Sequence, residues 1–380
     1  MSAAQWRRAM NTPVGAAGTH ATLPRPTTAT TVAASAVVDA PRWLQLLRTR
    51  VSARHVIVTL AVLLYPFVAT PFFTYQIGAQ ALGLGLIALS LTFLGGYGGM
   101  VSLAQATVAG LAGYMVAIFG SSTMATISLG WPWWLAVPFA LVIATVFATL
   151  VGWLSVRTEG IYTIMITLAI GVAFFYLTQQ NYSLFNGFQG FNQVFAPTVF
   201  DVDFREPVPF YFLALVCALA GYFLVKLLVR APFGVALQGI RDNPRRMHAL
   251  GYHVNAHRVA AYAVAGLMAA VGGVLMVWYN RRISPGTANI GAMINVLIIA
   301  VLGGMKRPVG AFIGAITFVL LQNFAIDLLG TAWRERFNLV IGGVFLAIVL
   351  FSPDGLLGIW SKLRLRLMPL QPTTNQRRLP

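Results

Sequence analysis

Ten apolar segments follow one another between residues 56 and 352, and they constrain the fold of this chain more than any other feature. A helix of about 20 predominantly apolar residues crosses the hydrocarbon core of a bilayer. The chain as a whole is 58% hydrophobic and only 9% charged, which is too apolar for a soluble domain. We therefore predict an all-α, polytopic integral membrane protein with about ten transmembrane helices, near residues 56–74, 78–96, 102–120, 133–154, 160–178, 209–229, 259–279, 290–304, 309–329 and 337–352.

Two of these segments, 290–304 and 337–352, are shorter than a helix that crosses perpendicular to the membrane plane. We expect them to be tilted, buried within the protein or broken, because irregular backbone at membrane depth is tolerated only inside the protein. Eight or nine crossings are therefore also compatible with the sequence.

The net charge of +17 is distributed unevenly between the two sides of the predicted membrane. When the N-terminus is placed in the cytoplasm, the Lys and Arg residues that fall outside are Arg205, Arg281, Arg282, Arg334 and Arg336. Cytoplasmic loops of membrane proteins carry such an excess of positive charge. Membrane topology thus explains the charge without a nucleic-acid partner, and we expect both termini to be cytoplasmic.

The chain divides into three regions by composition. Residues 1–52 are rich in Ala, Thr, Pro and Arg, which predicts a disordered basic cytoplasmic tail, although a transit peptide shares this composition. Residues 53–360 form the transmembrane domain. Residues 361–380 form a second basic cytoplasmic tail.

One polar and basic loop, residues 230–258, separates two strongly apolar segments. Pro232 suits the first position of a short helix that runs to about Arg241. Asn243 precedes Pro244, so it is driven out of the α region, and Asp242 or Asn243 can cap a second helix. Gly251 stands where a left-handed residue ends that second helix.

The second helix of this loop carries an apolar pair, Met247 and Leu250, beside two cations, Arg245 and Arg246. Such a surface suits a groove on a partner protein. The simpler alternative is that a basic loop between spans only obeys the positive-inside rule.

The loop carries a series of short motifs: Ala-Pro-Phe-Gly at 231–234, Ile-Arg-Asp-Asn at 240–243, Arg-Arg at 245–246 and Ala-Leu-Gly-Tyr at 249–252. In this order they resemble the cytoplasmic loop of the branched-chain amino acid permeases of ABC importers, in particular the LivM-type subunit. The resemblance implies that the loop docks into a cleft of an ATPase subunit. The implied coupling residues are Arg241, Asp242, Asn243, Pro244, Arg245, Arg246, Met247, Leu250 and Gly251.

The resemblance extends over about residues 75–330, with some departures. The glycine-rich stretch at 94–105 and its echo at 303–310 resemble further family stretches, but Ala104 replaces the usual Gly. In the external segment, Phe185 and Gln189 stand where the family commonly has Thr and Asp or Asn. These departures leave the transported solute open.

Glycine clusters at membrane depth let helices touch or let the backbone unwind around a solute. Simple helix packing explains them equally well, and an interhelical hydrogen bond would explain a lone Asn in a span. The candidate translocation path comprises Gly98, Gly99, Ser102, Gln105, Asn295, Gly303 and Gly304.

Several classes of chemistry lack their signature in this chain. There is no GxxxxGK[ST] loop, so the chain cannot bind and split ATP by that device. No nucleophile elbow, HExxH motif or paired carboxylate supports an enzyme. His248, His253 and His257 lie near one another without Cys or many carboxylates, so we expect no metal site. The single Cys217 excludes a disulfide framework.

The resemblance implies a non-catalytic permease subunit that imports branched-chain or related amino acids across the bacterial inner (plasma) membrane. Implied partners are a second permease subunit of LivH type, two ATP-binding subunits, an external substrate-binding protein and the lipid bilayer, with no nucleic acid. ATP would be used by the partner subunits, and this chain would bind no cofactor. The alternatives are a self-contained secondary carrier of small polar solutes, a permease of the same family for urea or short amides, and a membrane-anchored assembly subunit.

Overall fold

A computed structural model describes residues 53–329 except 125, 159 and 200, together with short pieces between 339 and 358. The two predicted tails and most of the segment 337–352 lie outside the described residues. The chain divides into two compact units, Met1–Thr59 and Leu60–Pro380. The description below concerns the larger unit.

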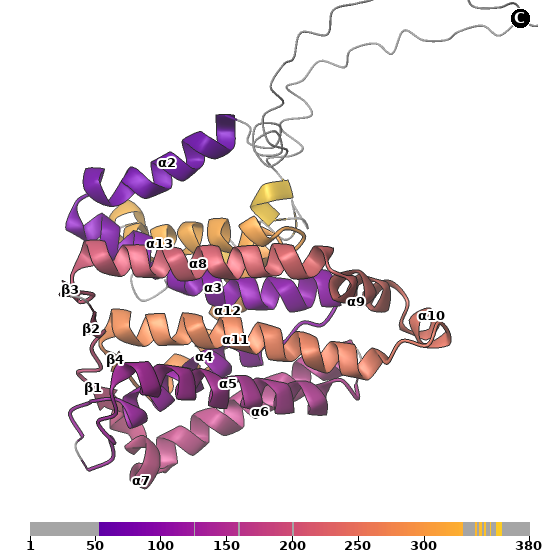
Figure 1. The fold of residues 1–380 in the computed structure, drawn as a ribbon, viewed down its shortest axis with the longest axis horizontal. Coiled ribbons are helices and arrows are strands. Elements are labelled where there is room, and N and C mark those ends of the chain that lie inside the picture. The colour runs from indigo at the N-terminus through magenta and orange to yellow at the C-terminus, as the bar shows by residue number, and fades with distance from the viewer. Residues whose placement is uncertain are drawn as a thin grey trace, which may run out of the picture. The chain divides into compact units, whose positions relative to one another are not determined.

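Helices make up most of the described chain, as predicted for an all-α protein (Figure 1). The α-helices are α2 Ala53–Val68, α3 Gln80–Thr92, α4 Ala104–Phe119, α5 Trp133–Ser155, α6 Ile161–Gln180, α7 Tyr182–Phe185, α8 Pro207–Arg230, α9 Pro232–Asp242, α10 Pro244–Ala249, α11 Val254–Asn280, α12 Ile290–Gly303 and α13 Pro308–Leu329. Two π-helical turns, η2 Phe73–Ala79 and η3 Phe93–Tyr97, extend α3 at both ends. Two 3₁₀ turns are η4 Gly187–Gln189 and η5 Pro285–Ala288.

Four strands of two residues each complete the fold. β1 Phe191–Asn192 pairs antiparallel with β4 Arg282–Ile283, and β2 Thr198–Val199 pairs antiparallel with β3 Val202–Asp203. The strands gather at one end of the helices, and α9 and α10 lie at the other (Figure 1). We call these the strand end and the α10 end.

Among the described residues, five helical stretches are long and apolar enough to cross a membrane: Phe73–Tyr97, Trp133–Ser155, Ile161–Gln180, Pro207–Arg230 and Val254–Asn280. The chain bends by 117° between α12 and α13, so the short segment 290–304 belongs to a broken element, as expected. Helix α4 is apolar but shorter than a span. The protein is polytopic, and the number of ten crossings stays a prediction.

The long helix α11 lies at the centre of the described helices and packs against α3, α4 and α5. Small residues make this close packing possible, because association of helices within a membrane depends on backbone approach rather than on the hydrophobic effect. A Cβ at Gly272 would lie 2.6 Å from Cγ1 of Ile87 in α3, and one at Gly273 would collide with the backbone of Ala109 in α4.

Substitution of Gly273 by Ala should therefore destabilise the bundle, because the colliding backbone atoms cannot rotate away as a side chain can. Overpacking of this kind costs about 1–3 kcal/mol. Gly286→Ala is the matched control, since its nearest neighbour is an atom of Ser284 at 3.8 Å. Thermal unfolding of the purified chain should show a lower midpoint for Gly273→Ala alone. Equal midpoints for the two variants would contradict the close crossing of α11 and α4.

Candidate functional site: a coupling loop and a central cavity

The loop at the α10 end has the local structure that its sequence predicts. Helix α9 begins at Pro232, and α10 begins at Pro244 after a break. Asn243 is extended, with φ −157° and ψ 94°, because the following proline disfavours the α region. Its side-chain oxygen accepts a hydrogen bond of 2.9 Å from the backbone N–H of Arg246 and so caps α10. Gly251 has the expected positive φ, +88°.

The two helices of the loop differ in how they are held. The inner face of α9 is buried, with Leu237 and Ile240 completely inaccessible to solvent. Helix α10 has no buried residue. The first helix is therefore fixed to the membrane domain, whereas the second projects from it (Figure 1).

The two residues of the predicted apolar pair, Met247 and Leu250, lie in different surroundings. The Met247 side chain is half-buried and lies over Gly239 of α9, where an added Cβ would be 2.8 Å from the Met247 sulfur. Leu250, in contrast, is 66% exposed, and Tyr252 beside it is 42% exposed. The exposed apolar surface at the end of α10 is thus Leu250 with Tyr252, while Met247 joins α10 to α9.

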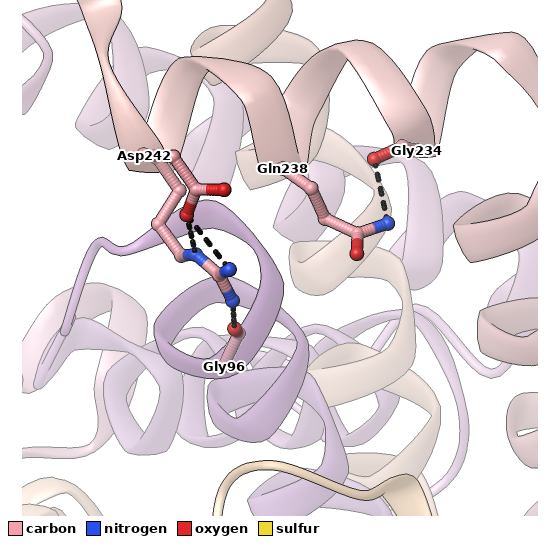
Figure 2. Close-up of polar contacts among 5 residues, drawn as sticks. Gly96, Gly234, Gln238 and Asp242 are labelled. Atoms are coloured by element: carbon pink, nitrogen blue, oxygen red, sulfur yellow. Dashed lines mark hydrogen bonds and ion pairs between the residues drawn. The ribbon is translucent and has the colours of Figure 1, made fainter. Parts of the chain in front are cut away.

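Arg241 connects the loop to the end of a membrane span through hydrogen bonds that end on the labelled residues Gly96 and Asp242 in Figure 2. Its Nη1 donates a hydrogen bond of 2.6 Å to the carbonyl oxygen of Gly96 in η3. Its Nε and Nη2 donate to Oδ1 of Asp242, at 2.9 Å and 2.8 Å, which orients the guanidinium. Gly99, with φ +68°, leaves room for the Arg241 side chain, because a Cβ there would lie 2.5 Å from Cγ of Arg241.

A second contact leads from η3 to the turn between α12 and α13. A Cβ at Gly96 would collide with the backbone carbonyl of Met305 in that turn. Gly303 packs against the backbone of Gly310, and Gly304 has φ +99°. The glycines at 303 and 304 therefore allow α12 and α13 to meet closely, and they place the turn against the same π-helical end that binds Arg241.

A central cavity of about 240 Å³ lies among α3, α4, α11, β4, η5, α12 and α13. Helices α3, α11, α12 and α13 each contribute a polar side chain as well as apolar side chains, whereas α4 contributes only Ala106, Ala109 and Gly110. Together with β4 and η5, the helices supply the polar rim, which is formed by Gln80, Asn280, Arg282, Thr287, Asn295 and Gln322. The apolar depth is formed by Leu84, Ile87, Ala109, Val296, Ile299 and Phe318. Arg282 is the one charged residue among the residues that line this cavity.

The pairing of β1 with β4 positions the charged rim residue. Asn192 lies opposite Arg282 in this pair, so the backbone of Arg282 is held by β1. The preceding residue, Arg281, lies elsewhere: its guanidinium is 6.0 Å from the ring centre of Phe195. Arg281 and Arg282 are adjacent in the sequence, but their side chains lie in different surroundings.

The described part of the chain does not enclose the cavity on every side. Asn295 and Gln322 line the cavity and are also exposed on the surface of the described chain. Ile290 and Ile294 of α12 are exposed beside them. The α12 and α13 side of the cavity is therefore open.

The seven predicted path residues do not meet at one place. Asn295 alone among them lines the central cavity. Gln105 is buried and accepts a hydrogen bond of 3.1 Å from Ser90 Oγ, which joins α4 to α3. Ser102 is also completely buried. The glycines lie toward the α10 end: Gly98 and Gly99 beside α9, and Gly303 and Gly304 at the turn after α12.

Sequence reasoning missed most of the polar rim. Gln80, Thr287 and Gln322 were not singled out, and Arg282 was noted only as an external charge. Several predicted spans carry a single Asn or Gln near one end, and this was the sequence signal for the polar rim. The sequence does not indicate that these side chains meet at one cavity. Among the described residues, no group of three His, Cys, Asp or Glu side chains gathers as a metal site.

Comparison with known proteins identifies the family of the chain. The family model described as "Branched-chain amino acid transport system / permease component" matches residues 73–349. The high-affinity branched-chain amino acid transport system permease protein LivM of Escherichia coli (strain K12) is 25% identical over 302 residues, which cover 73% of this chain and 67% of that protein. The nucleoside ABC transporter permease protein NupC of Lactococcus lactis is 25% identical over 255 residues, covering 63% of this chain and 78% of that protein.

A probable branched-chain amino acid transport permease protein LivH of Methanocaldococcus jannaschii is 28% identical over 156 residues, which cover 40% of this chain and 48% of that protein. No solved structure matches the chain significantly. The family model covers well over half of the chain, including α9, α10 and every element that lines the central cavity. The chain therefore belongs to the family of permease components of branched-chain amino acid transport systems.

Proposed function

We propose that this chain is the non-catalytic permease subunit of an ATP-driven importer of branched-chain or related amino acids, with the central cavity on the solute path and the α9–α10 loop as the ATPase-coupling element. The observation that carries the proposal is the bond from Arg241 to the Gly96 carbonyl. It joins an exposed loop, suited to a partner, to the span whose other residues line the cavity.

The chemistry of the cavity supports an amino acid as the solute. The carboxylate would pair with Arg282 at the rim, and the amide and hydroxyl groups there would accept hydrogen bonds from the ammonium. A branched aliphatic side chain would occupy the depth beside Val296, Ile299 and Phe318. A nucleoside has no carboxylate and would leave Arg282 unpaired, so an amino acid is the better match.

The open side of the cavity supports a second permease subunit. Polar side chains that face hydrocarbon are costly at membrane depth and usually face a protein or water-filled interior. Asn295 and Gln322 are exposed on this side, so a LivH-type permease that covers α12 and α13 would remove both from lipid. The path would then lie between the two permeases.

Coupling would proceed through the contacts at the α10 end. One of the two ATP-binding subunits would hold Leu250 and Tyr252, and its movement would displace α10 and, through Met247, α9. Arg241 would carry the displacement to η3, a π-helical turn of the kind that is frequent at functional sites. Met305 would pass it to α12, whose Asn295 and Val296 line the cavity.

The proposed function implies an orientation of the chain in the bacterial inner membrane. The α10 end, with Arg157, Arg245, Arg246 and the Lys306–Arg307 pair, would face the cytoplasm, as would both termini. The strand end would face outward and meet the substrate-binding protein. The chain itself would bind neither a cofactor nor nucleic acid, and ATP would be consumed by the partner subunits.

Reconstitution tests the proposal against a self-contained carrier. Proteoliposomes with the chain, a LivH-type permease, two ATP-binding subunits and an external binding protein should accumulate labelled leucine only when ATP is present on the ATPase side. The chain alone, given a proton or sodium gradient, should accumulate none. Gradient-driven uptake by the chain alone would establish the secondary carrier, and uptake of urea or acetamide in place of leucine would reassign the solute.

A further inference from the structure

Helix α5 has one buried side and one exposed apolar side. Ala136, Ala140, Ala144 and Ala148, four residues apart, are buried against the neighbouring helices. The opposite side exposes large apolar residues along its whole length: Phe139, Val142, Val146, Leu150 and Trp153. A stripe of this kind is the surface that contacts acyl chains.

The stripe ends in a pair that marks the depth of the lipid headgroups. Trp153 is 55% exposed. The guanidinium carbon of Arg157, one turn further, lies 4.3 Å above the centre of the Trp153 ring. Tryptophan and basic residues at the end of an apolar span occupy the membrane interface, where the indole meets the acyl boundary and the cation meets phosphate.

Directly beyond this pair lies a basic groove of about 470 Å³. Its lining contains three arginines and one histidine, which come from three segments: Arg157 after α5, Arg245 and His248 in α10, and Arg258 in α11. None of the described residues that line the groove is acidic. One wall of the groove thus belongs to the membrane core and the other to the projecting helix.

We propose that this groove binds the phosphate headgroup of an anionic phospholipid, whose acyl chains lie along the exposed stripe of α5. Guanidinium groups bind phosphate oxygens through paired, charge-assisted hydrogen bonds. The stripe, the Trp153–Arg157 pair and the groove follow one another in that order, which matches the order of acyl chain, glycerol and phosphate in a lipid. A soluble acidic partner would not need an apolar stripe that leads into its site.

The bound lipid would join α10 to the membrane core. Helix α10 has no buried residue of its own, so its position depends on few contacts within the chain. A headgroup between Arg245 and Arg157 would add a contact on the α5 side. This inference requires only that the chain is embedded in a membrane, and it is independent of the transported solute.

Native mass spectrometry of the delipidated full-length chain in detergent tests the proposal, with phosphatidylglycerol as the probe and phosphatidylcholine as the neutral comparison. The chain should bind one phosphatidylglycerol at least about tenfold more tightly than phosphatidylcholine. The double variant Arg157→Gln with Arg245→Gln should lose this preference, since each lost charged hydrogen bond weakens binding severalfold. The control Lys226→Gln removes another interfacial cation, which lies 5.7 Å from the ring centre of Tyr222 and outside the groove, and should keep it.

Two further measurements separate the sources of the ligand. Millimolar inorganic phosphate should not displace the lipid, because it lacks the acyl chains. In nanodiscs that contain phosphatidylglycerol and no ATP-binding subunit, the bound lipid should itself slow the modification of Arg157 and Arg245 by phenylglyoxal. Equal loss in the Lys226→Gln control, displacement by phosphate, or protection that appears only when ATP-binding subunits are added would each overturn the proposal. The last outcome would assign the groove to an acidic surface of the ATPase.

Discussion

Replacement of Arg241 by Ala is expected to abolish most of the amino acid import while the ATP-binding subunits stay bound and continue to hydrolyse ATP. The substitution removes the 2.6 Å bond to the Gly96 carbonyl, which joins α9 to the π-helical end of the span 73–97. A hydrogen bond to a charged group contributes about 1.5–3 kcal/mol, which corresponds to roughly tenfold or more in the coupling of the two segments. Leu250 and Tyr252, which face the proposed ATPase, are not altered.

The same helix offers a matched control for this experiment. Gln238 donates hydrogen bonds to the Gly234 carbonyl at 3.1 Å and to the Val229 carbonyl at 3.3 Å, so it ties α9 only to itself and to the end of α8 (Figure 2). Gln238→Ala should leave the ratio of leucine imported to ATP hydrolysed unchanged. Arg241→Lys should restore part of the import, because an ammonium can still donate to Gly96. A normal ratio in Arg241→Ala would mean that this bond has no part in coupling.

Replacement of Arg282 by Gln is expected to remove recognition of the solute carboxylate at the rim of the central cavity. In an assembled importer the external binding protein also selects the solute, so binding is best measured on the permease complex without it. Calorimetry with leucine and with leucinol, which lacks the carboxylate, should show a preference for leucine of about tenfold, the effect of one charge-assisted hydrogen bond at a partly exposed site. In Arg282→Gln the preference should disappear.

Arg281→Gln is the control for this prediction. Arg281 is the neighbour of Arg282 in sequence and carries the same charge, but its guanidinium lies beside Phe195 and not in the central cavity. It should therefore keep the preference for leucine. Equal losses in both variants would indicate a general effect of external positive charge, and equal binding of leucine and leucinol by the unaltered complex would remove the cavity as a carboxylate site.

The loop at 230–258 shows how much local sequence can determine. Pro232, the Asn243–Pro244 pair and Gly251 act on their own backbone or on residues within a few positions, so both helices, the break, the Asn243 cap and the left-handed glycine were predictable. Membrane embedding was predictable for a similar reason, because each apolar segment carries its own preference for the bilayer.

Contacts between distant parts of the chain were not predictable in this way. Arg241 and Asp242 resembled parts of a docking surface, but the partner of Arg241 is the carbonyl of Gly96, 145 positions earlier in the chain. Met247 and Leu250 looked like equivalent apolar anchors, yet Met247 lies over Gly239 because that residue has no side chain to exclude it. Gly239 receives the Met247 side chain, and the Gly96 carbonyl accepts a hydrogen bond from Arg241, only when the helices that carry these residues are packed together.

The sequence by itself determined the class of the protein and its broken loop at 230–258, since hydropathy and proline geometry act segment by segment. Only the tertiary structure decided where the cavity lies. Its polar rim takes Gln80, Asn280, Asn295 and Gln322 from four different helices, and its single charge, Arg282, is held there by a strand pair with Asn192. The predicted glycines lie instead toward the α10 end, where their missing side chains leave room for the Arg241 side chain and for the close approach of α12 to α13.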